Sequence, residues 1–277
     1  MNTKLVTLAI AILIGMSVYG QDSAEQQAVV LEGKKLYALE MASWYGTDVF
    51  LERFPDKKGS IGGYFSYMSG DSVNCLYFSK TIPPMVLAVI SFDSTFDVKS
   101  ARVNDTIRDF TAIENELYTI RLLALKLIRT DTSIVVYNNT NLNVIPLIEG
   151  DSRKVFVVTG PQKSGVVIFG NDYLVTFDKN NQVKSKRRLH NNVIMQEYSP
   201  DGRIDGVDVV SGIHSHLPET GELITSTDIC TLMLYAKYAG WESYVVVGEK
   251  YVNIWSCKSN SLLVVSKEVY QKIQDRK

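Results

Sequence analysis

The sequence has no excess of charge of either sign, which limits the partners it can attract electrostatically. Its 277 residues carry 29 Lys and Arg against 30 Asp and Glu. Non-specific binding to nucleic acid needs a basic surface that neutralises phosphates. The one basic run, Lys184–Arg188, is short, and we interpret it as a solvated strand or loop edge. The composition therefore predicts a protein that does not bind nucleic acid.

Cysteine is also scarce. Cys75, Cys230 and Cys257 allow at most one intrachain disulfide, which excludes a miniprotein held together by disulfides. Cys230 and Cys257 are the pair closest in sequence, but sequence spacing does not fix their separation in space, so their pairing stays open. Cys75 lies in an apolar stretch, which predicts a buried small hydrophobe rather than a nucleophile.

Long apolar runs are missing after the N-terminus. The apolar run Leu5–Ile14 follows Lys4 and is about half the roughly 20 residues that a membrane-spanning helix needs. Val18 and Gly20 suit the −3 and −1 positions of a signal-peptidase site. We therefore expect an export signal over residues 1–20 and a periplasmic or secreted protein without a stable membrane anchor.

The N-terminal part of the expected mature chain, residues 21–145, has the pattern of a helix–sheet–helix module. A helix is predicted over 22–50, a β-hairpin over 63–79 and a buried strand over 85–92. A second helix follows, with apolar residues at positions 110, 113, 117, 120, 124 and 127 forming one stripe. The residues of this region do not indicate its role.

The second part, residues 146–277, is rich in short strands. The predicted strands cover 154–159, 165–169, 172–177, 207–213, 244–247 and 251–255, and a helix is predicted over 227–238. This order favours an α+β fold, a mixed β-sheet with embedded helices, over a strict βαβ repeat. The boundary between the two parts is placed at 145/146 because the surrounding segment is rich in Asn and contains Pro146.

The segment Gly212–Asp228 concentrates the chemistry of the chain. His214 and His216 are two residues apart at the end of a predicted strand, so their imidazoles lie on the same face. Asp228, in the first turn of the following helix, can supply an oxygen ligand. Two histidines and a carboxylate leave a fourth tetrahedral position for water, which is the arrangement of catalytic zinc. We therefore predict a zinc site formed by His214, His216 and Asp228.

Simpler interpretations of these residues stay open. Thr225 and Asp228 also fit a capping box at the start of a helix, and a His pair can simply be a polar strand edge. The position of the pair between a strand and a helix favours the metal site. Thr225 is the candidate catalytic residue, as a donor to a developing oxyanion. His190 has no such pattern and is expected at the surface.

These residues resemble the signature of the JAMM (JAB/MPN) metallohydrolases, which is His-x-His-Pro, a spacer and Ser-x-x-Asp. Gly212–His216 is similar to the strand end of that signature, and Pro218 and Asp228 keep the family spacing to each other. Leu217 is inserted before the proline, and Thr225 stands where the family has serine. The resemblance implies a JAB/MPN-like fold, a zinc cofactor and hydrolysis of an amide or isopeptide bond in a peptide or protein substrate.

The general base is the part of the resemblance that the sequence does not supply. The family places a Glu shortly before a Gly-apolar-Gly segment, and the similar stretch here, Gln162–Gly170, contains none. Glu149 and Glu197 are the nearest acids, and Gln does not transfer protons as a carboxylate does. Three functions remain open: a zinc hydrolase with an unassigned base, a non-catalytic envelope protein that uses the scaffold as a binding module, and a structural protein with an incidental His pair.

Overall fold

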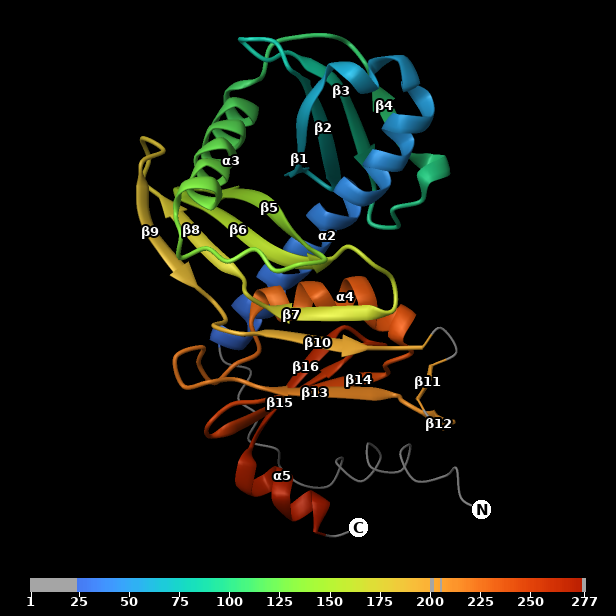
Figure 1. The fold of residues 1–277 in the computed structure, drawn as a ribbon, viewed down its shortest axis with the longest axis vertical. Helices are drawn as coiled ribbons and strands as arrows, with labels where there is room; N and C mark the ends of the chain where they lie inside the picture. Colours follow the sequence, from blue (N-terminus) through green and yellow to red (C-terminus); the bar gives the residue numbers. More distant parts are fainter. Residues whose placement is uncertain (1–23, 200–201, 205, 276–277) are drawn as a thin grey trace.

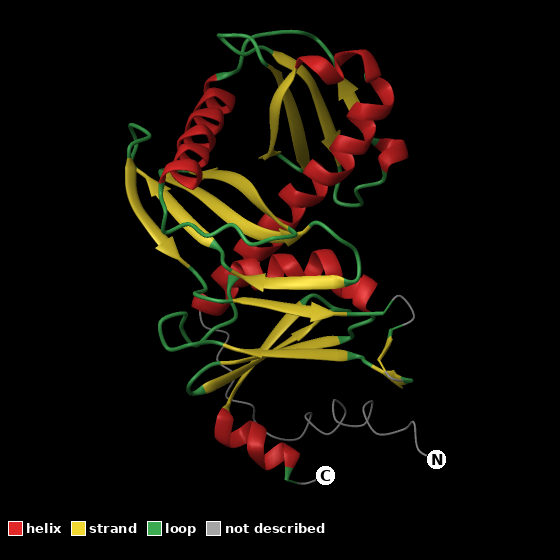
Figure 2. Cartoon of the chain, viewed as in Figure 1, coloured by secondary structure: helices red, strands yellow, loops and turns green. Residues whose placement is uncertain are grey.

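The chain folds as an α+β protein in which one long helix contacts several layers (Figures 1 and 2). The computed structural model describes residues 24–199, 202–204 and 206–275. The export signal expected over residues 1–20 therefore lies outside the described residues. Within the described ranges, no helix combines the length and apolarity that crossing a bilayer requires.

The N-terminal part has the helix–sheet–helix order that the sequence predicts. Its elements are α2 (Ala24–Arg53), β1 (Ile61–Ser69), β2 (Ser72–Ser79), β3 (Val86–Phe92), β4 (Arg102–Asn104) and α3 (Ala112–Thr130), with short 3-10 turns at Pro55–Ser60 and Val98–Ser100. The four strands are antiparallel neighbours in chain order, and β1 and β2 form the predicted hairpin. Leu117, Ile120 and Ala124 of the predicted apolar stripe are buried, whereas Ile113 is exposed.

A second antiparallel sheet packs against α3. Its strands, in spatial order, are β5 (Thr140–Glu149), β6 (Ser152–Pro161), β8 (Tyr173–Phe177) and β9 (Val183–Arg188). The basic run lies in β9, an edge strand, which agrees with its interpretation as a solvated edge. The boundary placed at 145/146 falls inside β5, which pairs with β6 along its whole length.

The C-terminal sheet is mixed. Its elements are β13 (Ser211–Ser215), α4 (Ser226–Ala239), β14 (Ser243–Val247), β15 (Tyr251–Ser256) and β16 (Ser261–Ser266), followed by α5 (Lys267–Gln274). β13 and β14 are parallel because α4 connects them, while β14, β15 and β16 are antiparallel. Two small ribbons complete the fold, β7 (Val166–Gly170) with β10 (Val193–Glu197) and β11 (Arg203–Ile204) with β12 (Val207–Asp208). The strand predicted over 207–213 is therefore divided between β12 and β13.

Two glycines allow α2 to approach its neighbours closely. A Cβ at Gly33 would lie 2.7 Å from the Cβ of Ile229 in α4, and one at Gly46 would lie 2.8 Å from the Cβ of Cys75 in β2. Cys75 is fully buried, as expected, and all three cysteines are free, so Cys230 and Cys257 form no disulfide. The close crossing of α2 and α4 fixes the start of α4, which carries Asp228.

Candidate metal centre

All three histidines of the chain converge on the carboxylate of Asp228. Nε2 of His216 lies 3.2 Å and Nε2 of His190 lies 3.4 Å from its Oδ2 atom. Nε2 of His214 lies 3.7 Å from the other oxygen, Oδ1. The four side chains are at most 9% exposed. The structure therefore brings the predicted set His214, His216 and Asp228 together and adds His190.

The two histidines of the motif are positioned by the parallel pairing of β13 with β14. His214 is opposite Val246 in that pair. His216 follows the strand, and its backbone N–H donates a 2.9 Å hydrogen bond to the carbonyl of Val247. Residues two apart on an extended chain project to the same side, and the two imidazole centroids are 5.2 Å apart. The prediction of two neighbouring imidazoles is confirmed.

Asp228 is held by a capping box at the start of α4. Thr225 is the N-cap residue, and its hydroxyl accepts a 3.1 Å hydrogen bond from the backbone N–H of Asp228. Oδ2 of Asp228 accepts bonds from the backbone N–H and the hydroxyl of Thr225, at 3.0 Å and 2.7 Å. Capping and a role in the cluster coexist because Oδ1 of Asp228 takes no part in the cap. The Thr225 hydroxyl would have to release Asp228 before it could donate to an oxyanion.

His190 corrects an expectation, because it is buried rather than at the surface. The hairpin of β8 and β9 pairs Tyr173 with Arg188, and the next N–H, of Leu189, donates to the carbonyl of Asp172 at 2.7 Å. This register places Nδ1 of His190 3.4 Å from Oδ2 of Asp172. His190 could therefore be predicted only from the register of this hairpin, because no local motif indicates its position.

Two of the imidazoles have a second polar group behind them. Nδ1 of His190 faces Asp172, whose carboxylate also accepts a 2.9 Å hydrogen bond from the backbone of Thr159. Nδ1 of His214 is 3.1 Å from the hydroxyl of Tyr244. Metal-binding histidines usually bond through their other ring nitrogen to a carboxylate or similar group, which orients the ring. Both rings are thus turned with Nε2 toward Asp228.

Gly212 makes room for the Tyr244 side chain. The two residues are neighbours in the β13–β14 pair, and a Cβ at position 212 would lie 2.4 Å from a ring carbon of Tyr244. Glycine is required at this position by the close approach of an aromatic ring and not by an unusual backbone conformation. A glycine before the His pair therefore serves the orientation of His214.

The charges of the cluster depend on one another. Burial acts to raise the pKa of Asp228, but the facing His190 and His214 outweigh it and hold that pKa well below its usual value. Burial acts to lower the pKa of His190, but Asp228 and Asp172 raise it to about 10. For His214, burial dominates and lowers the pKa to about 4. The carboxylate at the centre is therefore ionised.

The cluster contains buried polar atoms that no described group satisfies. They include Nε2 of His190, Nε2 of His214 and Oδ1 of Asp228. Buried polar atoms in proteins are nearly always hydrogen-bonded, so such a concentration needs an explanation. Ligand atoms of His190, His216 and Asp228 all lie within 4.8 Å of one another. This buried group can hold a metal ion.

Gln162 and Glu149, which the search for a general base considers, bond to groups other than the histidines. The Gln162 side chain donates to the carbonyl of Thr140 and to the side chain of Asn141. Glu149 forms an ion pair with Lys35 of α2. Among the described residues, the carboxylates in contact with the histidines are those of Asp228 and Asp172.

No family model matches this chain, and neither the curated proteins nor the solved structures contain a match. The class of the protein therefore follows from its own residues. It is an α+β chain with a buried group of histidines and a carboxylate that can hold a metal ion.

Proposed function

We propose that this cluster binds zinc. The observation that carries the proposal is the convergence of three Nε2 atoms, from two separate segments of the chain, on one buried carboxylate. Imidazole nitrogens and a carboxylate oxygen are a ligand set that Zn²⁺ accepts in tetrahedral sites. Asp172 and Tyr244 support the choice, because each stands behind one of the imidazoles.

The activity we propose is hydrolysis of an amide or isopeptide bond in a peptide or protein outside the cytoplasm. It rests on the JAMM resemblance and on the order of elements here, a strand with the His pair, a helix that starts with the Asp, and a parallel strand. Bound zinc makes hydroxide available near neutral pH. His216 and Asp228 would bind the zinc, and either His190 or His214 would supply the third ligand.

A second candidate is a non-catalytic protein in which zinc stabilises a binding module. Four protein donors are present, and four-coordinate zinc without an open position is the structural arrangement. Asp172, the one additional carboxylate beside the histidines in the described part of the chain, faces Nδ1 of His190 and accepts a hydrogen bond from the backbone N–H of Thr159. No further acid among the described residues contacts the histidines to act as a general base.

Peptide cleavage by the zinc-loaded protein separates the two candidates. The protein is incubated with a mixture of linear and isopeptide-linked peptides, and the products are read by mass spectrometry. We expect cleavage by the wild type and by Glu197→Gln, which changes an exposed carboxylate outside the cluster, and none by Asp228→Asn or after chelation.

X-ray absorption spectroscopy at the zinc edge reads the coordination in the same samples. If the protein is a hydrolase, the spectrum should show three protein ligands and a fourth ligand that is a water oxygen. Three imidazoles and one carboxylate, without cleavage, assign the second candidate. Failure to bind zinc rejects both.

A further inference from the structure

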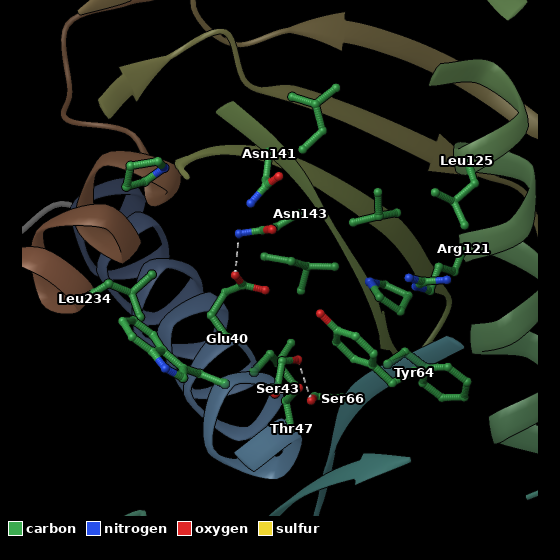
Figure 3. Close-up of a pocket in the computed structure, with 18 of the residues that line it drawn as sticks. Glu40, Ser43, Thr47, Tyr64, Ser66, Arg121, Leu125, Asn141, Asn143 and Leu234 are labelled. Atoms are coloured by element: carbon green, nitrogen blue, oxygen red, sulfur yellow. Dashed lines mark hydrogen bonds between the residues drawn. The ribbon is translucent and has the colours of Figure 1, made fainter. Parts of the chain in front are cut away.

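A second site lies away from the histidines, between the N-terminal module and the sheet of β5, β6, β8 and β9, here called the central sheet (Figure 3). It is a pocket of about 460 Å³ with walls from α2, β1, α3, β5 and α4. Small-molecule sites in proteins have volumes of about 300–1,000 Å³. The pocket shares α4 with the zinc cluster but none of the four cluster residues lines it, so it does not depend on the proposed hydrolase.

One wall of the pocket carries a guanidinium that forms no ion pair with any described residue. Arg121 extends from α3 into the pocket, and its Nε atom is buried and has no hydrogen-bond partner within the described residues. Two other arginines that reach into the protein are paired, Arg108 with Glu114 and Arg153 with Glu116. Buried charges are costly unless they are paired. The half-buried guanidinium, with its Nε atom unsatisfied, therefore favours an anionic group that enters the pocket.

Another wall carries a carboxyl group. Glu40 of α2 accepts a 2.8 Å hydrogen bond from the side-chain amide of Asn143 in β5 and forms no ion pair in the described part of the chain. Burial outweighs that bond and raises the pKa of Glu40 to about 7. Figure 3 shows the Glu40 carboxylate and Arg121 on separate walls, with the hydroxyl of Tyr64 directed into the space between them.

We propose that the pocket binds a small zwitterion, a free amino acid or a short peptide whose two termini are both free. Its carboxylate would bind the guanidinium of Arg121, which suits carboxylates because it can donate two parallel hydrogen bonds, and the hydroxyl of Tyr64. Its ammonium group would bind Glu40. A simple anion would leave Glu40 unmatched, and a simple cation would leave Arg121 unmatched.

The apolar part of the wall fits the side chains of such a ligand. Leu39 and Trp44 of α2 and Leu142 of β5 line the pocket beside the polar groups. Trp44 also provides a signal, because it is 44% exposed whereas Trp241 and Trp255 are 6% and 0% exposed. A ligand in this pocket should change the fluorescence of Trp44.

The test is a titration of the protein with leucine, Leu-Leu and Leu-Leu-Leu, followed by tryptophan fluorescence and calorimetry. The best of these is then compared with its N-acetyl and C-amide derivatives. We expect saturable binding of at least one probe and a loss of about tenfold or more for each blocked terminus, because each loses a charged contact. Arg121→Gln should weaken the free probe but not its amide, and Glu40→Gln should weaken the free probe but not its acetyl derivative.

Arg129→Gln is the matched control, because Arg129 lies on the same helix and is exposed. It should leave all affinities unchanged. Arg121→Lys replaces Arg121→Gln if circular dichroism shows that the latter is unfolded, and it should weaken the free probe by losing the paired hydrogen bonds. The proposal is overturned if no probe binds at about 10 mM. It is equally overturned if the blocked probes bind as well as the free one, or if the Arg121 variants bind like Arg129→Gln.

Discussion

Zinc should raise the thermal stability of this protein, and the structure sets the size of the effect. Oδ1 of Asp228 and Nε2 of the third histidine ligand, whether His190 or His214, are buried without a partner among the described residues. An unsatisfied buried polar atom costs about 1–3 kcal/mol, so satisfying both is worth about 2–6 kcal/mol. A ligand at 100 times its Kd stabilises the folded state by about 2.7 kcal/mol. For a chain of this size, a stabilisation of about 2.7 kcal/mol corresponds to an increase in Tm of about 5–10 °C.

The assay is scanning calorimetry of the chelator-treated protein with and without added zinc. Asp228→Asn is the decisive variant, because an amide oxygen can still accept the capping bonds of Thr225 while the central charge is lost. We expect no zinc-dependent increase for Asp228→Asn and the full increase for Glu197→Gln. An equal increase in Asp228→Asn, or none in the wild type at saturating zinc, would refute the reasoning.

Three further predictions concern the supports of the fold and the site. Thr225→Ala removes the N-cap of α4 and should lower the free energy of unfolding by about 1 kcal/mol in urea, and an unchanged value would contradict the cap. Burial acts to raise the pKa of Glu114, but Arg108 and other hydrogen-bond donors lower it to about 2. The stability from Glu114 is therefore present above pH 4.5 and lost as the pH falls toward 2. Glu114→Gln should cost about 3 kcal/mol at pH 7, and its difference from the wild type should shrink between pH 5 and 2 in urea unfolding; a constant difference would contradict this. Gly212→Ala should displace the Tyr244 ring and weaken zinc binding about tenfold in a competition titration, and an unchanged affinity would exclude that contact as a support.

Helices α2, α3 and α4 and the motif were predictable because their signals are local. The apolar stripe that predicts α3 repeats at helical spacing, and the His pair and Asp228 follow strand and helix periodicity. The capping box of Thr225 is likewise contained in four residues. Each of these patterns can be evaluated without knowing what lies next to it in space.

β5 was missed because its composition is that of an edge strand. The Asn-rich stretch with Pro146 suggested a domain boundary, yet Pro146 pairs with Val155 within a continuous strand. β5 is the outermost strand of its sheet, and an edge strand tolerates a proline because one side of the strand has no partner to bond.

His190 and the pocket were beyond local patterns for a different reason. His190 reaches Asp228 only because the β8–β9 hairpin sets its position beside Asp172. Glu40 and Arg121 lie on two different helices, and only the packing of the N-terminal module on the central sheet brings them to one pocket. Such contacts depend on tertiary structure, which the spacing of residues along the chain does not encode.

The most direct test of the proposed zinc centre is the metal content of the purified protein. The wild type and a His216→Ala/Asp228→Asn double variant are dialysed against zinc, washed and measured by elemental analysis, with circular dichroism to show that both are folded. The account predicts about one zinc per wild-type chain and almost none in the variant. A wild type without zinc, or equal zinc in both proteins, would contradict it.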